Sequence, residues 1–193
     1  MTADNTWTNT LGTWGITSNK GYFVTASGAG TVRGKARLEA DLATDDHSNT
    51  VTINNGGGAF VNRGLGPTVR GNASDLASYG VTLDNSQTLN LWKFNAAGAE
   101  TLITSTGFSH TISTNQTIKL EVIGTTINVY MNGSGTPTIS TTDSSVTTGT
   151  RVGVIAHTNT GTTRVVDSLT ATDEAAAPTG NRRRRMLLLG VGS

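Results

Sequence analysis

Three aromatic residues, Trp92, Tyr79 and Tyr130, occur in short runs that we expect to form neighbouring strands. An exposed aromatic ring stacks on the apolar face of a sugar, while Asn and Asp side chains beside it bind the sugar hydroxyls. These three residues are therefore candidates for glycan contact. Packing in the core is the alternative reading of each, and we also prefer a core position for Trp14, Phe94 and Phe108.

Three carboxylates, those of Asp45, Asp46 and Asp143, fall in segments that we expect to be loops. Carboxylate oxygens are the hard ligands that Ca²⁺ takes in proteins. Aspartate is also a common turn residue, because its side chain bonds its own backbone two residues on. We favour the turn role, and we expect no cofactor. If calcium binds, these three residues are its candidate ligands.

The C-terminal end carries a basic segment followed directly by an apolar one. Guanidinium groups bind carboxylates or phosphates with two parallel hydrogen bonds, and an apolar cluster leaves water only if it finds an apolar groove. The segment is a docking peptide for a partner protein, a membrane-surface anchor or a disordered end, and we favour docking. Its residues are Arg182, Arg183, Arg184, Arg185, Met186, Leu187, Leu188 and Leu189.

The composition narrows the classes of protein that the chain can be. Its 193 residues fit one domain, and the absence of cysteine excludes disulfides and thiolate metal sites. Without Arg182–Arg185 the chain keeps 10 basic residues against 13 acidic ones, so its body has a net charge of −3 and no general nucleic-acid-binding surface is indicated. Neither a secretory signal nor an apolar run of about 20 residues is visible.

Alternating hydrophobic residues indicate strands throughout. Ile118, Leu120 and Val122 share one face of a run, while Lys119 and Glu121 lie on the other face, which we expect to be solvated. Thr136–Thr150 is expected to be one long loop. The predicted strands are Gly21–Ala26, Lys35–Leu42, Thr50–Asn54, Gly58–Asn62, Ser78–Leu83, Thr88–Phe94, Thr101–Ser105, Ile118–Val122, Ile127–Met131, Arg151–His157 and Thr163–Thr170.

Turn residues between these short runs, at intervals of roughly 8–14 residues, are typical of an all-β sandwich or barrel. The composition changes after Asp173, where an Ala-rich segment containing Pro178 and Gly180 begins. We therefore predict a β-sandwich over residues 1–173, a linker over 174–181 and a docking tail over 182–193.

The order of several segments resembles the concanavalin A-like lectin/glucanase and laminin G-like superfamily over about residues 7–172. The segments that carry the resemblance are Leu11–Ile16, Tyr79–Leu83, Leu89–Phe94, Ile118–Gly124 with Ile127–Gly133, and Val165–Leu169. The resemblance implies an all-β fold in which two antiparallel sheets form a jelly-roll sandwich.

The resemblance also raises the question of glycoside hydrolysis. Laminarinase-type members of the superfamily place carboxylates at alternating positions of one strand, and Glu39 and Asp41 match the first part of that spacing. Ala43 and Thr44 stand where the second glutamate of the pattern would be, and retaining catalysis needs two carboxyl groups. We therefore expect no enzyme activity and keep a degenerate glycoside hydrolase as a third hypothesis.

Sandwiches of this kind with a short tail are similar to accessory proteins of tailed-bacteriophage virions. This likeness implies a structural virion protein, either a head decoration or a minor tail protein, made in the host cytoplasm. Its sandwich would face outward, contact host-surface glycans and self-associate, and its tail would bind other virion proteins. The alternative is a free carbohydrate-binding lectin module, because one fold hosts many functions.

Overall fold

The computed structural model describes residues 7–17, 20–25, 32–54, 64–84, 86–109, 115–158 and 165–174. These residues form strands, turns and loops, and no helix able to span a membrane occurs among them. The strands are β1 (Trp7–Leu11), β2 (Thr13–Thr17), β3 (Lys20–Thr25), β4 (Val32–Leu38), β5 (His47–Asn54), β6 (Leu65–Gly71), β7 (Ser78–Leu83), β8 (Thr88–Phe94), β9 (Glu100–Gly107), β10 (Gln116–Ile123), β11 (Thr126–Met131), β12 (Ile139–Thr142), β13 (Arg151–Thr158) and β14 (Val165–Asp173).

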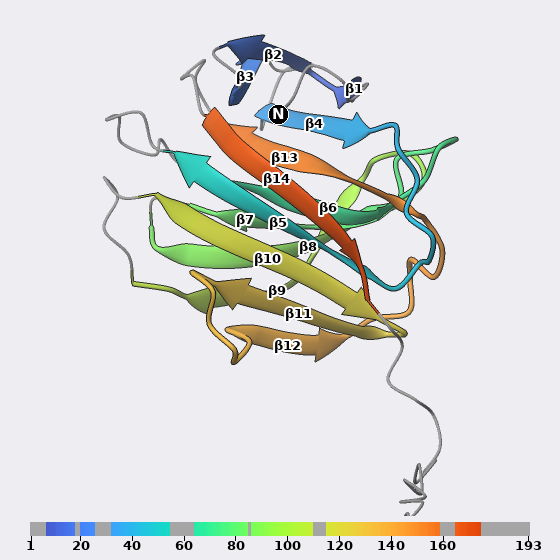
Figure 1. The fold of residues 1–193 in the computed structure, drawn as a ribbon, viewed down its shortest axis with the longest axis vertical. Helices are drawn as coiled ribbons and strands as arrows, with labels where there is room; N and C mark the ends of the chain where they lie inside the picture. Colours follow the sequence, from blue (N-terminus) through green and yellow to red (C-terminus); the bar gives the residue numbers. More distant parts are fainter. Residues whose placement is uncertain are drawn as a thin grey trace, which may run out of the picture.

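The strands form two antiparallel sheets that pack face to face (Figure 1). Sheet A has the order β1-β4-β13-β6-β7-β8-β9, and sheet B has the order β12-β11-β10-β5-β14-β3-β2. The sequence prediction of an all-β, two-sheet antiparallel sandwich is therefore confirmed.

The alternation read from the sequence points the apolar side chains into the space between the sheets. Ile118, Leu120 and Val122 of β10 are fully buried there, in one cluster with residues such as Val81 and Leu91 of sheet A. Because successive side chains of a strand point to opposite faces, the residues between them lie on the outside of the sandwich. This core fixes which side chains of each sheet remain available for other roles.

Four strands of the structure, β1, β2, β6 and β12, are absent from the sequence prediction. The segment Thr136–Thr150 is not one long loop, because Ile139–Thr142 forms β12 at the edge of sheet B. Ile139 pairs with Val129 of β11 and is 6% exposed, so burial of this side chain accounts for the additional strand. The predicted strand Gly58–Asn62 lies outside the described residues.

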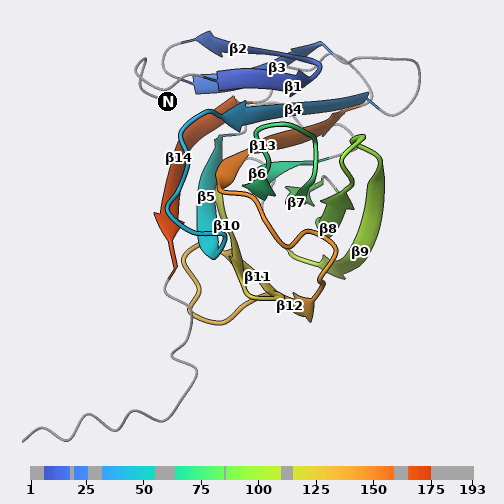
Figure 2. The ribbon, with the colours of Figure 1, turned by 90° about the vertical axis from the view of Figure 1, so that its right-hand side faces the viewer.

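Sheet A bends strongly from β4 to β9, so that its outer face is concave (Figure 2). Side chains of non-adjacent strands meet across this face. The Nζ atom of Lys35 on β4 lies 5.0 Å from the ring centre of Phe94 on β8, although three strands separate β4 from β8 in the sheet. Below, the concave face means the outward residues Lys35, Ser78, Thr82, Trp92, Phe94, Glu100, Leu102, Ile155 and His157.

Candidate functional site

Trp92 lies on the concave face with its orientation fixed by two neighbours. Leu91 before it on β8 points into the core, so Trp92 points outward, where it is half-buried. Its indole Nε1 donates a hydrogen bond of 3.0 Å to Oγ1 of Thr82, and its ring centre lies 5.1 Å from that of His157 with the planes at 55°. The indole is thus held in place while part of it remains in contact with solvent.

An acidic group lies next to this indole. Nε2 of His157 on β13 is 3.2 Å from Oε2 of Glu100 on β9, and the two side chains are 1% and 11% exposed. Since three strands separate β13 from β9, the curvature of sheet A produces this contact. The concave face therefore combines a carboxylate, an imidazole and an indole within one small region.

Leu102 extends the apolar part of this region to the edge strand. It pairs with Trp92 in the register of β8 and β9, and it is 45% exposed. An exposed Leu beside a partly exposed Trp gives a small apolar surface, and opposite residues of antiparallel strands have Cβ atoms only about 5 Å apart. The pair can contact the apolar face of a sugar ring, while the nearby carboxylate of Glu100 can accept bonds from hydroxyl groups.

Lys35 forms part of the floor of the concave face. It is 4% exposed, and its Nζ donates to the carbonyl oxygen of Leu76 at 2.7 Å and to Oγ of Ser78 at 2.6 Å. Burial, together with the positive charge of Arg37, lowers the pKa of Lys35 to about 7, and Asp75 offsets this only in part. The bond to Leu76 shows that the connection between β6 and β7 covers this part of the face.

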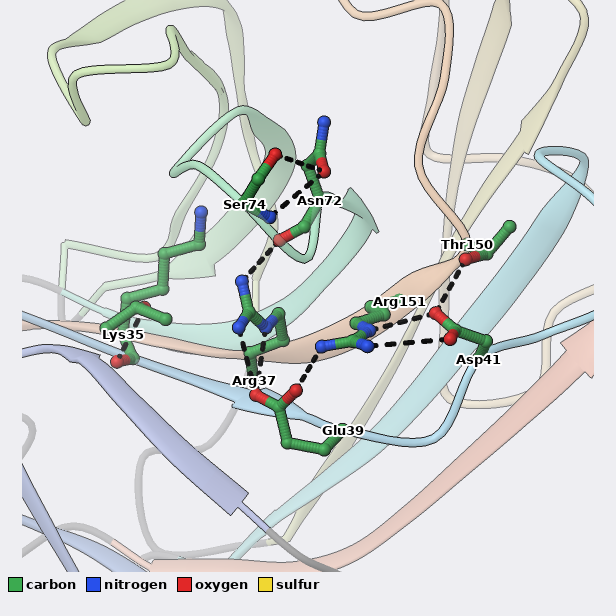
Figure 3. A network of polar contacts seen from close by, with 9 residues as sticks. Lys35, Arg37, Glu39, Asp41, Asn72, Ser74, Thr150 and Arg151 are labelled. Atoms are coloured by element: carbon green, nitrogen blue, oxygen red, sulfur yellow. Dashed lines mark hydrogen bonds and ion pairs between the residues drawn. The ribbon is translucent and has the colours of Figure 1, made fainter.

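Glu39 and Asp41, the residues that matched a glycosidase spacing, are held in an ion-pair network beside the concave face (Figure 3). Arg37 binds Glu39 at 2.9 Å, Arg151 bridges Glu39 and Asp41, and Thr150 also donates to Asp41.

These contacts do not favour acid catalysis. A hydrogen bond from Thr8, with the contacts from Arg37, lowers the pKa of Glu39, and the bond from Arg151 lowers that of Asp41. A general acid needs a raised pKa, so these two carboxylates fit ion pairing and not glycoside hydrolysis.

Tyr130 lies on the opposite side of the molecule, on the outer face of sheet B. Its hydroxyl donates to Oε1 of Glu121 at 3.0 Å, and Nζ of Lys119 lies 5.5 Å from its ring centre. Lys119 also binds Glu121 at 2.7 Å and Glu174 at 2.9 Å. The outer face of sheet B, defined by Ser48, Thr50, Lys119, Glu121, Asn128 and Tyr130, thus has its charged groups bound to one another.

The expectation that Glu121 is solvated is wrong. Glu121 points away from the core, but it is only 7% exposed, because Lys119, Asn128 and Tyr130 all bond its carboxylate. Although burial raises its pKa, these three hydrogen bonds and the charge of Lys119 make the net shift a lowering. An outward position in a strand does not by itself expose a residue.

Tyr79 is in the core, so it is not available to stack on a sugar from solvent. It is fully buried, its hydroxyl donates to Oδ1 of Asp143 at 2.8 Å and accepts a bond from the amide of Val146, and burial raises its pKa to about 12. Trp92, Tyr79 and Tyr130 therefore occupy three different layers and do not form one site. Alternation alone could not separate them, since it does not indicate which sheet a strand joins.

The three calcium candidates are each bonded to protein donors. Asp45 accepts a bond from the amide of Gly149, Asp46 binds Arg70, and Asp143 binds Lys93. Among the described residues there is no group of three or more His, Cys, Asp or Glu side chains that could hold a metal ion. Asp143 also accepts a bond from the amide of Ser145, two residues on, which is the turn role that we favoured. Asp45 and Asp46 instead bond the distant residues Gly149 and Gly124, so they connect loops and do not form turns of their own.

Asp143 shows how strongly such contacts act on a carboxylate. Burial alone would raise its pKa, but hydrogen bonds from Ser145, Tyr79 and Lys93 lower it to about 2.

The predicted docking residues Arg182–Leu189 lie outside the described residues. Sequence reasoning also missed Lys35, Glu100 and Leu102, whose grouping depends on the curvature of sheet A.

No protein-family model matches the sequence, and no curated protein matches it. Solved structures do match. The carbohydrate-binding module CBM66 from Bacillus subtilis has a TM-score of 0.66 at 18% identity, covering 86% of this chain and 94% of the module.

Two further solved domains are also similar. The exoplasmic/lumenal domain of VIP36, in a form bound to Ca²⁺ and Man3GlcNAc, has a TM-score of 0.60 at 12% identity, covering 91% of this chain and 86% of that domain. The legume lectin-like domain from Entamoeba histolytica has a TM-score of 0.57 at 11% identity, covering 88% of this chain and 90% of that domain. With its two antiparallel sheets, the chain has the concanavalin A-like lectin/glucanase jelly-roll fold.

Proposed function

We propose that this protein is a non-catalytic carbohydrate-binding domain whose glycan site is the concave face of sheet A, centred on Trp92. The observation that carries the proposal is the pairing of half-buried Trp92 with exposed Leu102, beside the carboxylate of Glu100. Apolar contact surface with a few fixed polar groups is the usual composition of a small-molecule site.

The similar structures support the class of ligand and not its identity. One is a carbohydrate-binding module and another binds Man3GlcNAc, but identities of 18% and 12% carry no ligand residues across to this chain. The glycan is therefore assigned only as a class. Its contacts are proposed from the side chains of this chain.

The concave face is favoured over the outer face of sheet B because of how the aromatic residues are engaged. Lys119 lies over the ring of Tyr130 and Glu121 takes its hydroxyl, so both the ring face and the polar group already have protein partners. The indole N–H of Trp92 is bonded to Thr82, and its ring lies against the ring of His157. Trp92 is nevertheless only half-buried. It retains surface for a ligand.

A glycan array with three forms of the full chain tests this assignment. We expect wild type to bind a subset of glycans, Trp92→Ala to lose about 10-fold or more in affinity, equal to about 1.4 kcal/mol, and Tyr130→Ala to bind as wild type. Tyr130→Ala is the matched control, because it also removes a half-buried aromatic from an outer face. Circular dichroism of all three forms verifies that they are folded.

Binding lost in Tyr130→Ala but kept in Trp92→Ala would place the site on sheet B and contradict the proposal. Wild type that binds none of the arrayed glycans, while folded, would count against carbohydrate binding itself. We expect binding to persist in EDTA, since the three calcium candidates Asp45, Asp46 and Asp143 are each bonded to protein donors.

The virion role remains a prediction from the sequence. It rests on the tail over residues 182–193, which lies outside the described residues. Genes for capsid, portal or tail proteins beside the gene for this chain would support it. A glycan-binding domain displayed on a virus particle would agree both with carbohydrate binding and with the virion role.

A further inference from the structure

A pocket of about 440 Å³ lies at one end of the sandwich, away from the concave face. Residues of the β4–β5 loop, strand β6, the β10–β11 turn and the β12–β13 loop line it, among them Asp45, Asp46, Arg70 and Thr125. Glycan binding at Trp92 does not involve this pocket, so its role is a separate question.

Arg70 forms a fixed wall of the pocket. Its side chain is 3% exposed, and its backbone has a φ of 50°, which is uncommon for a residue other than glycine. The guanidinium donates four hydrogen bonds of 2.7–3.1 Å, to the carbonyl oxygens of Asp45, Val146 and Gly124 and to Oδ1 of Asp46. Arg70 therefore ties the loops together and is not available to a ligand.

The pocket presents negative charge and hydrogen-bond acceptors. Asp45 uses Oδ1 for the amide of Gly149, and Asp46 uses Oδ1 for Arg70 and for the amide of Gly124. Among the described residues, no protein group donates a hydrogen bond to Oδ2 of Asp45 or to Oδ2 of Asp46. Two carboxylates against one guanidinium give the lining a net charge of −1, which fits an organic cation with several N–H groups.

The chain leaves the sandwich at the rim of this pocket. The amide of Glu174 donates to the carbonyl oxygen of Asp46 at 2.8 Å, and the carboxylate of Asp173 accepts bonds from the amides of Ala43 and Thr44. Hydrogen bonds from those amides lower the pKa of Asp173, so it adds a further negative charge beside the pocket. The basic segment of the chain begins only eight positions after Glu174, at Arg182.

The connection from Glu174 to Arg182 is long enough to bring the arginines back to the pocket. Eight residues span at most about 26–29 Å when extended. Since the connection starts at the rim, the pocket is within reach of Arg182–Arg185. Tethering gives the arginines an effective concentration in the millimolar range at a site they can reach.

We propose that this pocket binds the chain's own C-terminal arginines, with a guanidinium of the segment Arg182–Arg185 donating to Oδ2 of Asp45 and Asp46. Arginine suits the site better than lysine, because its planar group donates to two oxygens at once. Three features support this occupant: the charge of the lining, the position where β14 ends, and the length of the connection. The proposal does not depend on glycan binding.

Disulfide trapping in the full chain tests the proposal, because the chain has no cysteine of its own. The test variant carries Thr125→Cys on the exposed pocket lining and Met186→Cys after the arginines. The control carries Thr170→Cys with Met186→Cys. Thr170 is exposed on β14, only four residues before Glu174, but it does not line the pocket.

Under mild oxidation we expect the intramolecular disulfide to form about five-fold faster in the test variant than in the control. This excess in the rate of disulfide formation should disappear in 0.5 M NaCl, where charges are screened beyond about 4 Å. It should also disappear when Arg182–Arg185 are changed to Gln, a change outside the sandwich. Asp45→Asn, which keeps an acceptor for Gly149, should reduce it.

Equal rates in the two variants would overturn the proposal. A rate difference that persists in 0.5 M NaCl or in the Arg-to-Gln variant would also overturn it, since charge would then not hold the segment. Disulfide-linked dimers as the main product would overturn binding within one chain and assign the pocket to a second copy.

Discussion

The outer faces of the two sheets hold their charged groups in different ways. On sheet B, Lys119 is bonded to Glu121 and Glu174, and these partners lie close together around strands β10, β5 and β14. On sheet A, Lys35 is buried, and its hydrogen bonds to the described residues go to a carbonyl and a hydroxyl. Charges that neutralise each other stabilise a surface, whereas a buried amine without a bonded carboxylate makes folding less favourable.

Curvature explains this difference. On the outer face of sheet B, most of these contacts join residues opposite each other in register, such as Lys119 with Tyr130 and Glu121 with Asn128. The contact of Lys119 with Glu174, just after β14, crosses a single strand, β5. The concave face joins strands that are not neighbours, as His157 of β13 with Glu100 of β9. Because side chains converge on the concave face, Lys35 is removed from water and polar groups lie close to Trp92. A partly apolar surface with a few fixed polar groups and a residue of shifted pKa is typical of binding sites.

The largest expected effect concerns the core beneath both faces. Val122→Asp places an unpaired charge between the sheets, where Val122 is fully buried, and should lower the free energy of unfolding by roughly 3–5 kcal/mol. Urea titration followed by circular dichroism measures the loss. An unchanged midpoint would mean that the inner and outer faces of β10 are assigned wrongly, and with them the whole comparison.

Lys35→Met should stabilise the protein by about 1–3 kcal/mol at pH 7, because it removes a charge that burial disfavours. The pKa of Lys35 is about 7 in the folded state and is higher in the unfolded chain, so the unfolded state binds more protons between these values. Stability of wild type should therefore rise by about 1.4 kcal/mol per pH unit from pH 7 towards pH 10 through this group.

The Lys35→Met variant lacks that contribution, so its advantage over wild type should shrink as the pH rises. Urea titrations of both forms at pH 7, 8.5 and 10 measure the difference. Parallel stability curves would contradict the account of the concave face.

Glu121→Ala should destabilise the protein by about 1–2 kcal/mol, because it removes three hydrogen bonds and leaves Lys119 with Glu174 alone. The lowered pKa of Glu121 makes its contribution present above the ordinary glutamate value and lost as the pH falls through the folded pKa. Thermal unfolding at pH 7 and pH 3 should show a larger difference between the two forms at the higher pH. An equal Tm at pH 7 would show that the outer face of sheet B does not stabilise the fold.

The smallest effect is expected in the ion-pair network beside the concave face. Glu39→Gln and Asp41→Asn should leave the urea midpoint close to that of wild type, because ion pairs in contact with water contribute little to stability, and they should leave glycan affinity unchanged. Incubation with laminarin measures activity as released reducing ends. Reducing ends released by wild type but not by Glu39→Gln would contradict a non-catalytic protein.

The fold could be predicted from the sequence because it depends on local alternation. Leu120 and Val122 alternate with polar residues, and burial on one face of a strand follows from that pattern wherever the strand lies. Strand β12 could not be predicted, because Ser140, Thr141 and Thr142 add no alternating apolar pattern to Ile139. Only pairing with β11 makes this segment a strand.

The candidate site could be predicted only in part. An aromatic in an alternating run has two readings, core or surface, and for Trp92 the outward reading holds. Tyr79 satisfies the same pattern but faces inward, and Tyr130 faces outward on the other sheet. Glu100 and His157 are 57 positions apart in the sequence, and only the bend of sheet A brings them together.

The most direct test of the central claim is a ¹⁵N and methyl NMR titration of the full chain with the best glycan from the array. The indole N–H signal of Trp92, identified by its loss in Trp92→Phe, should shift together with the methyl signals of Leu102. Signals of Lys119 and Tyr130 should stay in place, because the outer face of sheet B has its groups already engaged. Shifts confined to β10 and β11, with the Trp92 indole unmoved, would contradict a glycan site on the concave face.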